Sequence, residues 1–195
     1  MSVWQGAPVR DTPGGEGGWQ TSLNVGETFT FLGETEEAER GGETREYSKV
    51  RLKGGSEGWV RSAFIANEAT PAVVVRKAIL HERPTPMAST DKVFQPMDVV
   101  AIVKDQDGWL QVRGKRRAAT WLESGWVRPN AVSTQETDVA VAALRTKAMN
   151  QDTPSAQRKA LKRVVDNPSL QETVFIDSLR AQLDTLARAD TTSTP

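Results

Sequence analysis

The amino-acid sequence predicts a mainly β protein with α-helices, in which two small β-barrels precede a helical segment of about three helices. Three observations lead to this prediction: a series of strand-like blocks occurs twice before Ser133, the hydrophobic period changes after Val132, and helix-start signals follow. We therefore expect a first barrel over residues 1–70, a second over 71–133, helices over 134–190 and a disordered polar tail over 191–195.

The repeat is clearest in a glycine-led apolar strand, since Gly58–Ile65 returns as Gly125–Val132. Three earlier blocks recur in the same order: Pro8–Pro13 with Ile79–Pro84, Gly26–Leu32 with Met97–Val103, and Tyr47–Arg51 with Trp109–Arg113. The spacing between copies changes only around residues 34–46 of the first copy and residues 114–124 of the second. Insertions confined to loops are expected of a shared strand framework.

The repeated blocks have the composition and the period of strands. Thr28–Leu32 and Val99–Val103 are rich in β-branched and aromatic residues, and polar and apolar residues alternate in the Tyr47 and Trp109 blocks. Gly54-Gly55 and Asp107-Gly108 are turn signals between strands. Several short strands within about 60 residues indicate a small closed barrel, so barrels are expected over about residues 5–68 and 71–133.

The order of the blocks resembles the bacterial SH3 family (SH3b). Each copy has an extended pair ending in proline, a turn and strand that open with Gly-Glu in the first copy, an aromatic-x-x-Val-Arg strand and Gly-Trp-Val. The second copy is the better match, through Asp107–Val112 and Gly125–Val127, whereas the first departs at its glycine-rich Pro13–Gly18. The resemblance covers roughly residues 7–133 and implies two SH3-like barrels. Members of this family often bind cell-wall peptides or glycan, or accompany wall-cleaving enzymes.

The segment after Val132 has the 3.6-residue period of amphipathic helices. Ser133–Glu136 and Ser169–Glu172 fit the capping-box pattern, and Thr153-Pro154 fits a cap followed by a first-turn proline. Apolar stripes are expected on three helices: Val141, Leu144 and Ala148; Ala160, Leu161, Val164 and Val165; Phe175, Leu179, Leu183 and Leu186. Short helices with one apolar stripe each must pack on one another or on a barrel.

The composition argues against enzyme chemistry. The chain has no Cys and a single histidine, His81, so a cysteine nucleophile, a disulfide or a histidine-based metal site is not expected. SH3b repeats are often followed by a papain-like amidase domain, but the helical segment has neither Cys nor His. We therefore expect no catalytic residues, no cofactor and no metal. Lys115-Arg116-Arg117 is a short basic run in a chain of zero net charge, so no nucleic-acid partner is expected.

Aromatic side chains and the arginines beside them are the candidate ligand-binding residues: Trp19, Tyr47, Trp59, Arg61, Trp109, Trp121, Trp126 and Arg128. Trp59 and Trp126 either line a ligand groove or seal the barrels, and the second reading is favoured because tryptophan is mostly buried. Trp19 and Trp121 lie in loop-like segments, where an exposed ring suggests a contact surface and a buried one a satellite cluster.

Two functions remain open. The first is a non-catalytic binding module of the bacterial cell envelope that recognises cell-wall peptide or glycan, and the second is a scaffold that binds a protein partner through barrels and helices. A monomer is expected. No apolar run reaches the roughly 20 residues of a membrane span, and Met1-Ser2 leads directly into folded-looking sequence. The expected location is the envelope or periplasm, or outside the cell, including as a lipoprotein, if an export signal has been removed; the cytoplasm is the alternative.

Charge divides the two expected barrels. Residues 1–70 carry seven basic and eleven acidic side chains, whereas residues 71–133 carry ten and six. The linker at Ala69–Pro71 is short and partly stiffened by proline. We therefore expect one compact pair of barrels, held mainly by apolar contact because exposed ion pairs contribute only about 0–1 kcal/mol each. The cleft between the barrels is the expected ligand site.

Overall fold

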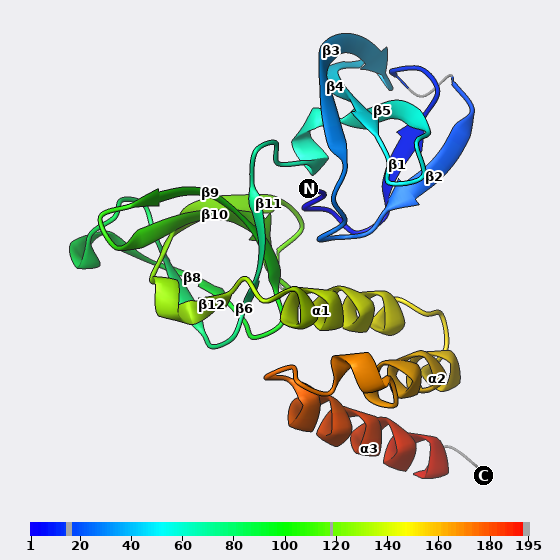
Figure 1. Ribbon diagram of the computed structural model, residues 1–195, viewed down its shortest axis with the longest axis vertical. Helices are drawn as coiled ribbons and strands as arrows, with labels where there is room; N and C mark the ends of the chain where they lie inside the picture. The colour runs from blue at the N-terminus through cyan, green and yellow to red at the C-terminus, as the bar shows by residue number, and fades with distance from the viewer. Residues whose placement is uncertain (15–16, 118, 193–195) are drawn as a thin grey trace.

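The computed structural model describes residues 1–14, 17–117 and 119–192, which form two β-sheets and three α-helices (Figure 1). The first sheet has the strand order β2-β1-β5-β4-β3. Its strands are β1 (Ala7–Arg10), β2 (Trp19–Leu23), β3 (Thr30–Arg40), β4 (Glu43–Arg51) and β5 (Glu57–Arg61). The protein is thus mainly β with C-terminal helices, in agreement with the sequence prediction.

The second sheet has the order β12-β6-β9-β10-β11-β7-β8 and curls into an open half-barrel (Figure 1). Its strands are β6 (Thr70–Val74), β7 (Ala78–His81), β8 (Ser89–Phe94), β9 (Val99–Gln106), β10 (Trp109–Lys115), β11 (Leu122–Val127) and β12 (Val132–Ser133). The helices are α1 (Glu136–Met149), α2 (Pro154–Val165) and α3 (Ile176–Thr192), with 3-10 turns at Ser62–Phe64, Pro86–Ala88, Pro129–Ala131 and Pro168–Leu170.

Both sheets contain the same five-strand arrangement. The order β2-β1-β5-β4-β3 of the first sheet recurs as β8-β7-β11-β10-β9 in the second, which adds β6 and β12 beyond β9. The register agrees as well, since Lys49 pairs with Trp59 in the first sheet and Gln111 with Trp126 in the second. The blocks that recur in the sequence therefore occupy the same positions in the two sheets.

The turns at Asn24–Glu27 and Gln95–Asp98, which precede β3 and β9, have the same hydrogen bond. The amide of Asn24 donates to the carboxylate of Glu27 over 2.9 Å, and the amide of Gln95 donates to that of Asp98 over 2.8 Å. The third residue of each turn has a positive φ, 83° at Gly26 and 70° at Met97. A non-glycine residue in this region is uncommon, so the turn geometry persists in the second copy where the glycine does not.

The insertion expected as a loop in the first copy is instead an extension of a β-hairpin. β3 and β4 continue to Arg40 and from Glu43, and Gly41 and Gly42 connect them with φ values of 63° and 78°. A two-residue hairpin turn with positive φ at both positions favours glycine. The Gly-Gly dipeptide therefore lets the inserted residues pair as strands.

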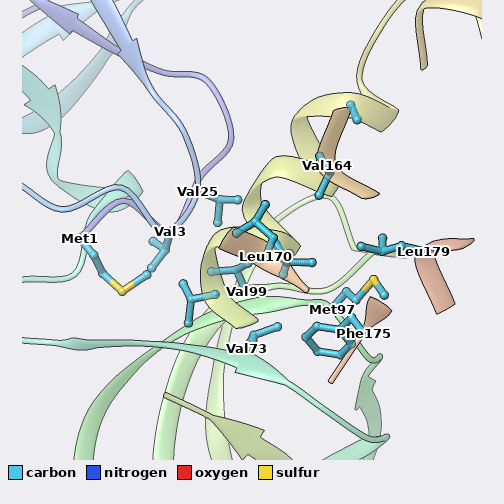
Figure 2. Packing of buried hydrophobic residues seen from close by; sticks show 14 of the residues in the cluster. Met1, Val3, Val25, Val73, Met97, Val99, Val164, Leu170, Phe175 and Leu179 are labelled. Carbon is cyan, nitrogen blue, oxygen red and sulfur yellow. The ribbon is translucent and has the colours of Figure 1, made fainter. Parts of the chain in front are cut away.

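Three apolar clusters hold the molecule together. Val9, Leu23, Val50 and Val60 lie in the core of the first sheet, and Leu80, Phe94, Val100 and Val112 lie inside the half-barrel. The third cluster, here called the joining cluster, lies on the outer face of the half-barrel (Figure 2). It includes Met1, Val3 and Val25 from the N-terminal unit, Val73, Met97 and Val99 from the half-barrel, and Val139, Val141, Leu161, Val164, Leu170, Phe175 and Leu179 from the helical segment.

Of the three predicted helix starts, the structure confirms one and contradicts two. Thr153 caps α2 as predicted, because its side chain accepts a hydrogen bond from the amide of Ala156 over 3.2 Å. The predicted box at Ser133 is wrong: the Ser133 hydroxyl accepts from Gln135 and donates to Asp138, and Gln135 is the N-cap of α1. The box at Ser169 is also wrong, because Pro168–Leu170 forms a 3-10 turn and α3 begins only at Ile176.

The apolar stripes are largely confirmed, with one exception on α1. The predicted stripe residues of α2 and α3 are buried or packed against the joining cluster, but Leu144 of α1 is 40% exposed. α1 lies between the half-barrel and α2, so it buries residues on two sides, including Val139 and Ala142. At the C-terminus α3 runs to Thr192, two residues into the predicted tail, and residues 193–195 lie outside the described residues.

The glycine that opens each Gly-Trp-Val-Arg block is required by close approach to the first strand of its copy. A Cβ on Gly58 would lie 2.6 Å from Val9 Cγ1 and 2.8 Å from the Arg10 carbonyl oxygen. We predict that Gly58→Ala lowers the free energy of unfolding by about 1–3 kcal/mol, the usual cost of overpacking, as measured by urea denaturation.

Two substitutions calibrate this prediction. Gly125→Ala should cost less, because its Cβ would meet Leu80 Cδ2 at 3.0 Å and the His81 carbonyl oxygen at 3.1 Å. Gly54→Ala should be neutral or slightly stabilising, because nothing lies within 4 Å of its Cβ position. Equal stability of the Gly58→Ala and Gly54→Ala variants would contradict the proposed close approach.

Candidate functional site

The first sheet presents a row of aromatic and basic side chains across neighbouring strands. Arg10 on β1 pairs with Trp19 of β2 on one side and with Trp59 of β5 on the other. Trp59 pairs in turn with Lys49 of β4, whose ammonium nitrogen lies 5.9 Å from the centre of the Trp59 ring. Directly paired residues share a face of the sheet. Trp19 thus lies on the same face as Arg10 and Trp59, with 64% of its surface exposed. It was predicted to lie in a loop, but it is the first residue of β2.

A pocket of about 300 Å³ opens on the same face. Three of the predicted ligand-binding residues line it together: Tyr47, Trp59 and Arg61. They are joined by Arg10, Arg40 and Arg45, together with Pro8 and Phe64, so that four guanidinium groups and three aromatic rings surround one space. We call this the arginine pocket.

The arginines of this pocket are incompletely paired. Arg10 donates to the Gly17 carbonyl oxygen over 2.7 Å, but its buried Nε atom has no hydrogen-bond partner among the described residues. Arg61 lies over the Phe64 ring at 5.2 Å, and Arg40 makes no described hydrogen bond or ion pair. Within the part of the chain that the structure describes, Arg45 alone of the four arginines has a carboxylate partner, Glu43, at 2.7 Å. The pocket therefore offers unused donors for an oxygen acceptor.

Glu43, the described carboxylate partner of Arg45, is affected by the cations of the pocket. The hydrogen bond from Arg45 is the main reason that the pKa of Glu43 lies below its usual value, and the charge of Arg61 lowers it further. The Glu43 side chain is 69% exposed at the rim, so it does not fill the pocket. The described lining of the pocket holds four arginines and no carboxylate, which gives it a surplus of positive charge.

The second sheet carries the corresponding residues in a closed arrangement. Trp126 pairs with His81, as Trp59 pairs with Arg10. The Arg128 guanidinium lies 3.8 Å from the centre of the Trp109 ring, and His81 packs against the same ring edge-on at 4.6 Å. The residue at the Phe64 position is Ala131, so Arg128 has no second ring to lie over and covers Trp109 instead. Trp109 and Trp126 are buried, but neither belongs to the apolar cluster inside the half-barrel. Trp59, which was expected like Trp126 to seal a barrel, lines the arginine pocket.

The cleft expected between the two units exists as a second pocket, of about 400 Å³. Val3, Gln5 and Val25 line it from the first unit, and Met97–Val99 and Lys115–Arg117 from the half-barrel. α1 closes it with Arg145, Thr146, Met149 and Asn150. The basic run Lys115–Arg117 therefore lines this cleft.

The charged groups in this cleft already have partners within the protein. Arg116 binds Glu123 through two nitrogens, and Arg117 lies 3.7 Å from Asp98 and donates to the Pro96 carbonyl oxygen. Arg145 donates to Gln182 over 3.1 Å. Burial raises the pKa of Asp98 and lowers that of Arg145. The cleft is thus less able than the arginine pocket to receive an anionic ligand.

The predicted site residues consequently fall into separate groups. Tyr47, Trp59 and Arg61 meet at the arginine pocket, with Trp19 further along the same face. On the second sheet Arg128 covers Trp109, and Trp126 pairs with His81. Trp121, 70% exposed, lies in the turn before β11 and reaches neither pocket lining. The predicted set lacked the other residues that line this pocket: Pro8, Arg10, Arg40, Arg45 and Phe64. Recognising the Gly41-Gly42 hairpin would have placed Arg40 and Arg45 on the same face as Tyr47.

The ion pair between Arg116 and Glu123 at the cleft gives a pH-dependent prediction. Hydrogen bonding from Arg116, supported by Lys92, lowers the pKa of Glu123 below its ordinary value of 4.5. The stabilisation is therefore present above pH 4.5 and is lost as the pH falls through the lower folded pKa. Glu123→Gln should reduce the free energy of unfolding at pH 7 by about 1 kcal/mol or less, with the difference from the parent shrinking in acid.

Denaturant titrations across pH measure this difference. Glu57→Gln is the matched control, because it breaks the pair with Arg51, in which both partners are well exposed, and should have a smaller effect. A Glu123→Gln variant as stable as the parent at pH 7 would contradict the prediction.

Comparison with models of known protein families and with curated proteins finds no match to this chain. In the described part of the chain, no helix combines the length and the apolar character needed to cross a membrane. The function must therefore be inferred from the geometry of the site. The repeated face of the two sheets, open with an arginine pocket in the first and closed by Arg128 in the second, is the feature on which that inference depends.

Proposed function

We propose that this chain is a non-catalytic binding module of the bacterial cell envelope, in which the first of two SH3b-like units carries the recognition surface. Its ligand is cell-wall peptide or glycan. The observation that carries this proposal is the row Trp19, Arg10 and Trp59, which continues into the arginine pocket on an exposed sheet face. Aromatic rings provide flat surfaces for sugars and extended peptides, and guanidinium groups bind carboxylates.

The repeated strand order supports the SH3b-like part of the proposal. Two copies of one five-strand arrangement, with the same registers and the same turn, fit the resemblance found in the sequence. Divergence of the two faces fits a division of labour: the first unit binds and the second supports it through the joining cluster.

A scaffold that binds a protein partner is the second candidate, and exposed apolar side chains outside the arginine pocket favour it. Trp121 is 70% exposed, Met87 is 93% exposed and Val174 is 66% exposed, and none of them lines a described pocket of the first sheet. Exposed large apolar side chains, tryptophan above all, are common at protein interfaces.

Retention on purified, insoluble peptidoglycan tests the proposed function. We expect the parent protein to sediment with the peptidoglycan and Trp59→Ala to be retained about tenfold less, since one aromatic contact contributes on the order of 1–3 kcal/mol. Trp121→Ala is the matched control and should be retained like the parent. No soluble wall fragments should appear, because the proposed module is non-catalytic.

Two outcomes would contradict the proposal. If the parent is not retained, the scaffold becomes the better explanation. If Trp121→Ala loses retention while Trp59→Ala does not, the face with the arginine pocket is not the recognition surface.

A further inference from the structure

We infer that the arginine pocket binds a ligand group with at least two negatively charged oxygens, either a phosphoryl group or a pair of carboxylates. The inference rests on the proposed binding function of the first sheet and specifies the ligand chemistry. Its basis is the convergence of Arg10, Arg40, Arg45 and Arg61 on one pocket from strands β1, β3, β4 and β5.

The charge of the pocket opposes that of its surroundings. Residues 1–70 carry seven basic and eleven acidic side chains, so four of the seven basic residues gather where only Glu43 is described as a partner. A unit with excess negative charge does not attract anions in general. Binding of an anion therefore has to come from this local cluster.

The donors favour an oxyanion over other anions. A guanidinium group presents a planar fork that matches carboxylate and phosphate geometry through two parallel hydrogen bonds. The Arg10 Nε atom is buried and has no partner in the described ranges of the chain, and a buried donor without an acceptor is costly. An oxygen of the ligand would supply that acceptor.

The number of negative charges expected on the ligand follows from the surplus of positive charge in the arginine pocket. Among the described residues, Arg45 is neutralised by Glu43 at 2.7 Å and the other three arginines have no carboxylate partner, which leaves the charges of Arg10, Arg40 and Arg61 for the ligand. A single carboxylate would leave most of this charge uncompensated. A phosphoryl group carries about two negative charges near neutral pH, and two adjacent carboxylates carry the same.

The aromatic side chains determine what the charged group is attached to. Tyr47 and Phe64 line the pocket with Trp59, and Phe64 stacks on Trp4 at 4.9 Å. Lys115 of the half-barrel lies over the other side of this stack, 4.5 Å from the centre of the Trp4 ring. The stack holds Phe64 in place, so the pocket is preorganised for a ligand with a ring or an extended backbone beside its charged end.

Isothermal titration calorimetry at low ionic strength tests the inference with two probes, inorganic phosphate and glutarate. At least one should bind with one-to-one stoichiometry and weaken as salt rises. The probe that binds distinguishes a phosphoryl from a dicarboxylate source. Arg40→Gln should weaken binding about tenfold, and Arg40→Lys should give an intermediate loss because the charge remains but the planar fork does not.

Arg51→Gln is the matched control. Arg51 lies on β4 and is paired with Glu57, outside the pocket lining, so its loss should leave binding unchanged. If the parent binds neither probe, or if Arg51→Gln weakens binding as much as Arg40→Gln, the inference is wrong. Retention on peptidoglycan without binding of either anion would refute this inference alone, whereas anion binding without retention would refute only the proposed wall-binding function.

Discussion

The arrangement of the whole molecule depends on the outer face of the half-barrel being apolar. Strands β6 and β9 bury both of their faces: Val100 points into the half-barrel core, whereas Val73 and Val99 belong to the joining cluster. The N-terminal unit covers part of that outer face and the helices cover the rest, as the surroundings of Val99 indicate (Figure 2). Apolar burial is the main favourable contribution to such packing, so this cluster fixes where the two sheets lie relative to each other.

Electrostatics contributes less to that arrangement than the opposite charges of the units suggest. In the hairpin of β3 and β4, Glu34 pairs with Lys49 and Glu43 pairs with Arg45. In the half-barrel, Glu123 pairs with Arg116 and Lys92. These ion pairs each lie within one unit. Among the described residues, the polar contacts between the first unit and the half-barrel are the hydrogen bonds from Arg113 to the carbonyl oxygens of Ala63 and Ile65 and the contact of the Lys115 ammonium group with the Trp4 ring.

Strand positions were predictable because a repeated sequence provides two independent samples of one pattern. The Gly-Trp-Val-Arg blocks, for instance, identify the same strand, β5 and β11, in both copies. Helix starts were less predictable. Ser133 has the right spacing to Glu136, but the buried carboxylate of Asp138 accepts from its hydroxyl and also from Thr173 and the Val174 amide. Tertiary hydrogen bonds here override a local capping pattern.

The candidate site was predictable only in part, for a similar reason. The aromatic residues could be found from the repeat, but a pocket needs residues from several strands, and Arg40 reaches it only because β3 and β4 extend as a hairpin. The apolar outer face of the half-barrel is easier to recognise in the sequence. Pro71–Val75 and Val99–Val103 are continuously apolar, which is typical of strands buried on both faces.

The central claim is that apolar packing on the half-barrel joins both sheets and the helices into one body. Small-angle X-ray scattering at low and high salt tests it most directly. The account predicts a single compact profile that matches the structure and is little changed by salt, because the joining cluster is apolar. A flexible, extended profile at low salt, or a compact profile that opens when salt is added, would contradict it.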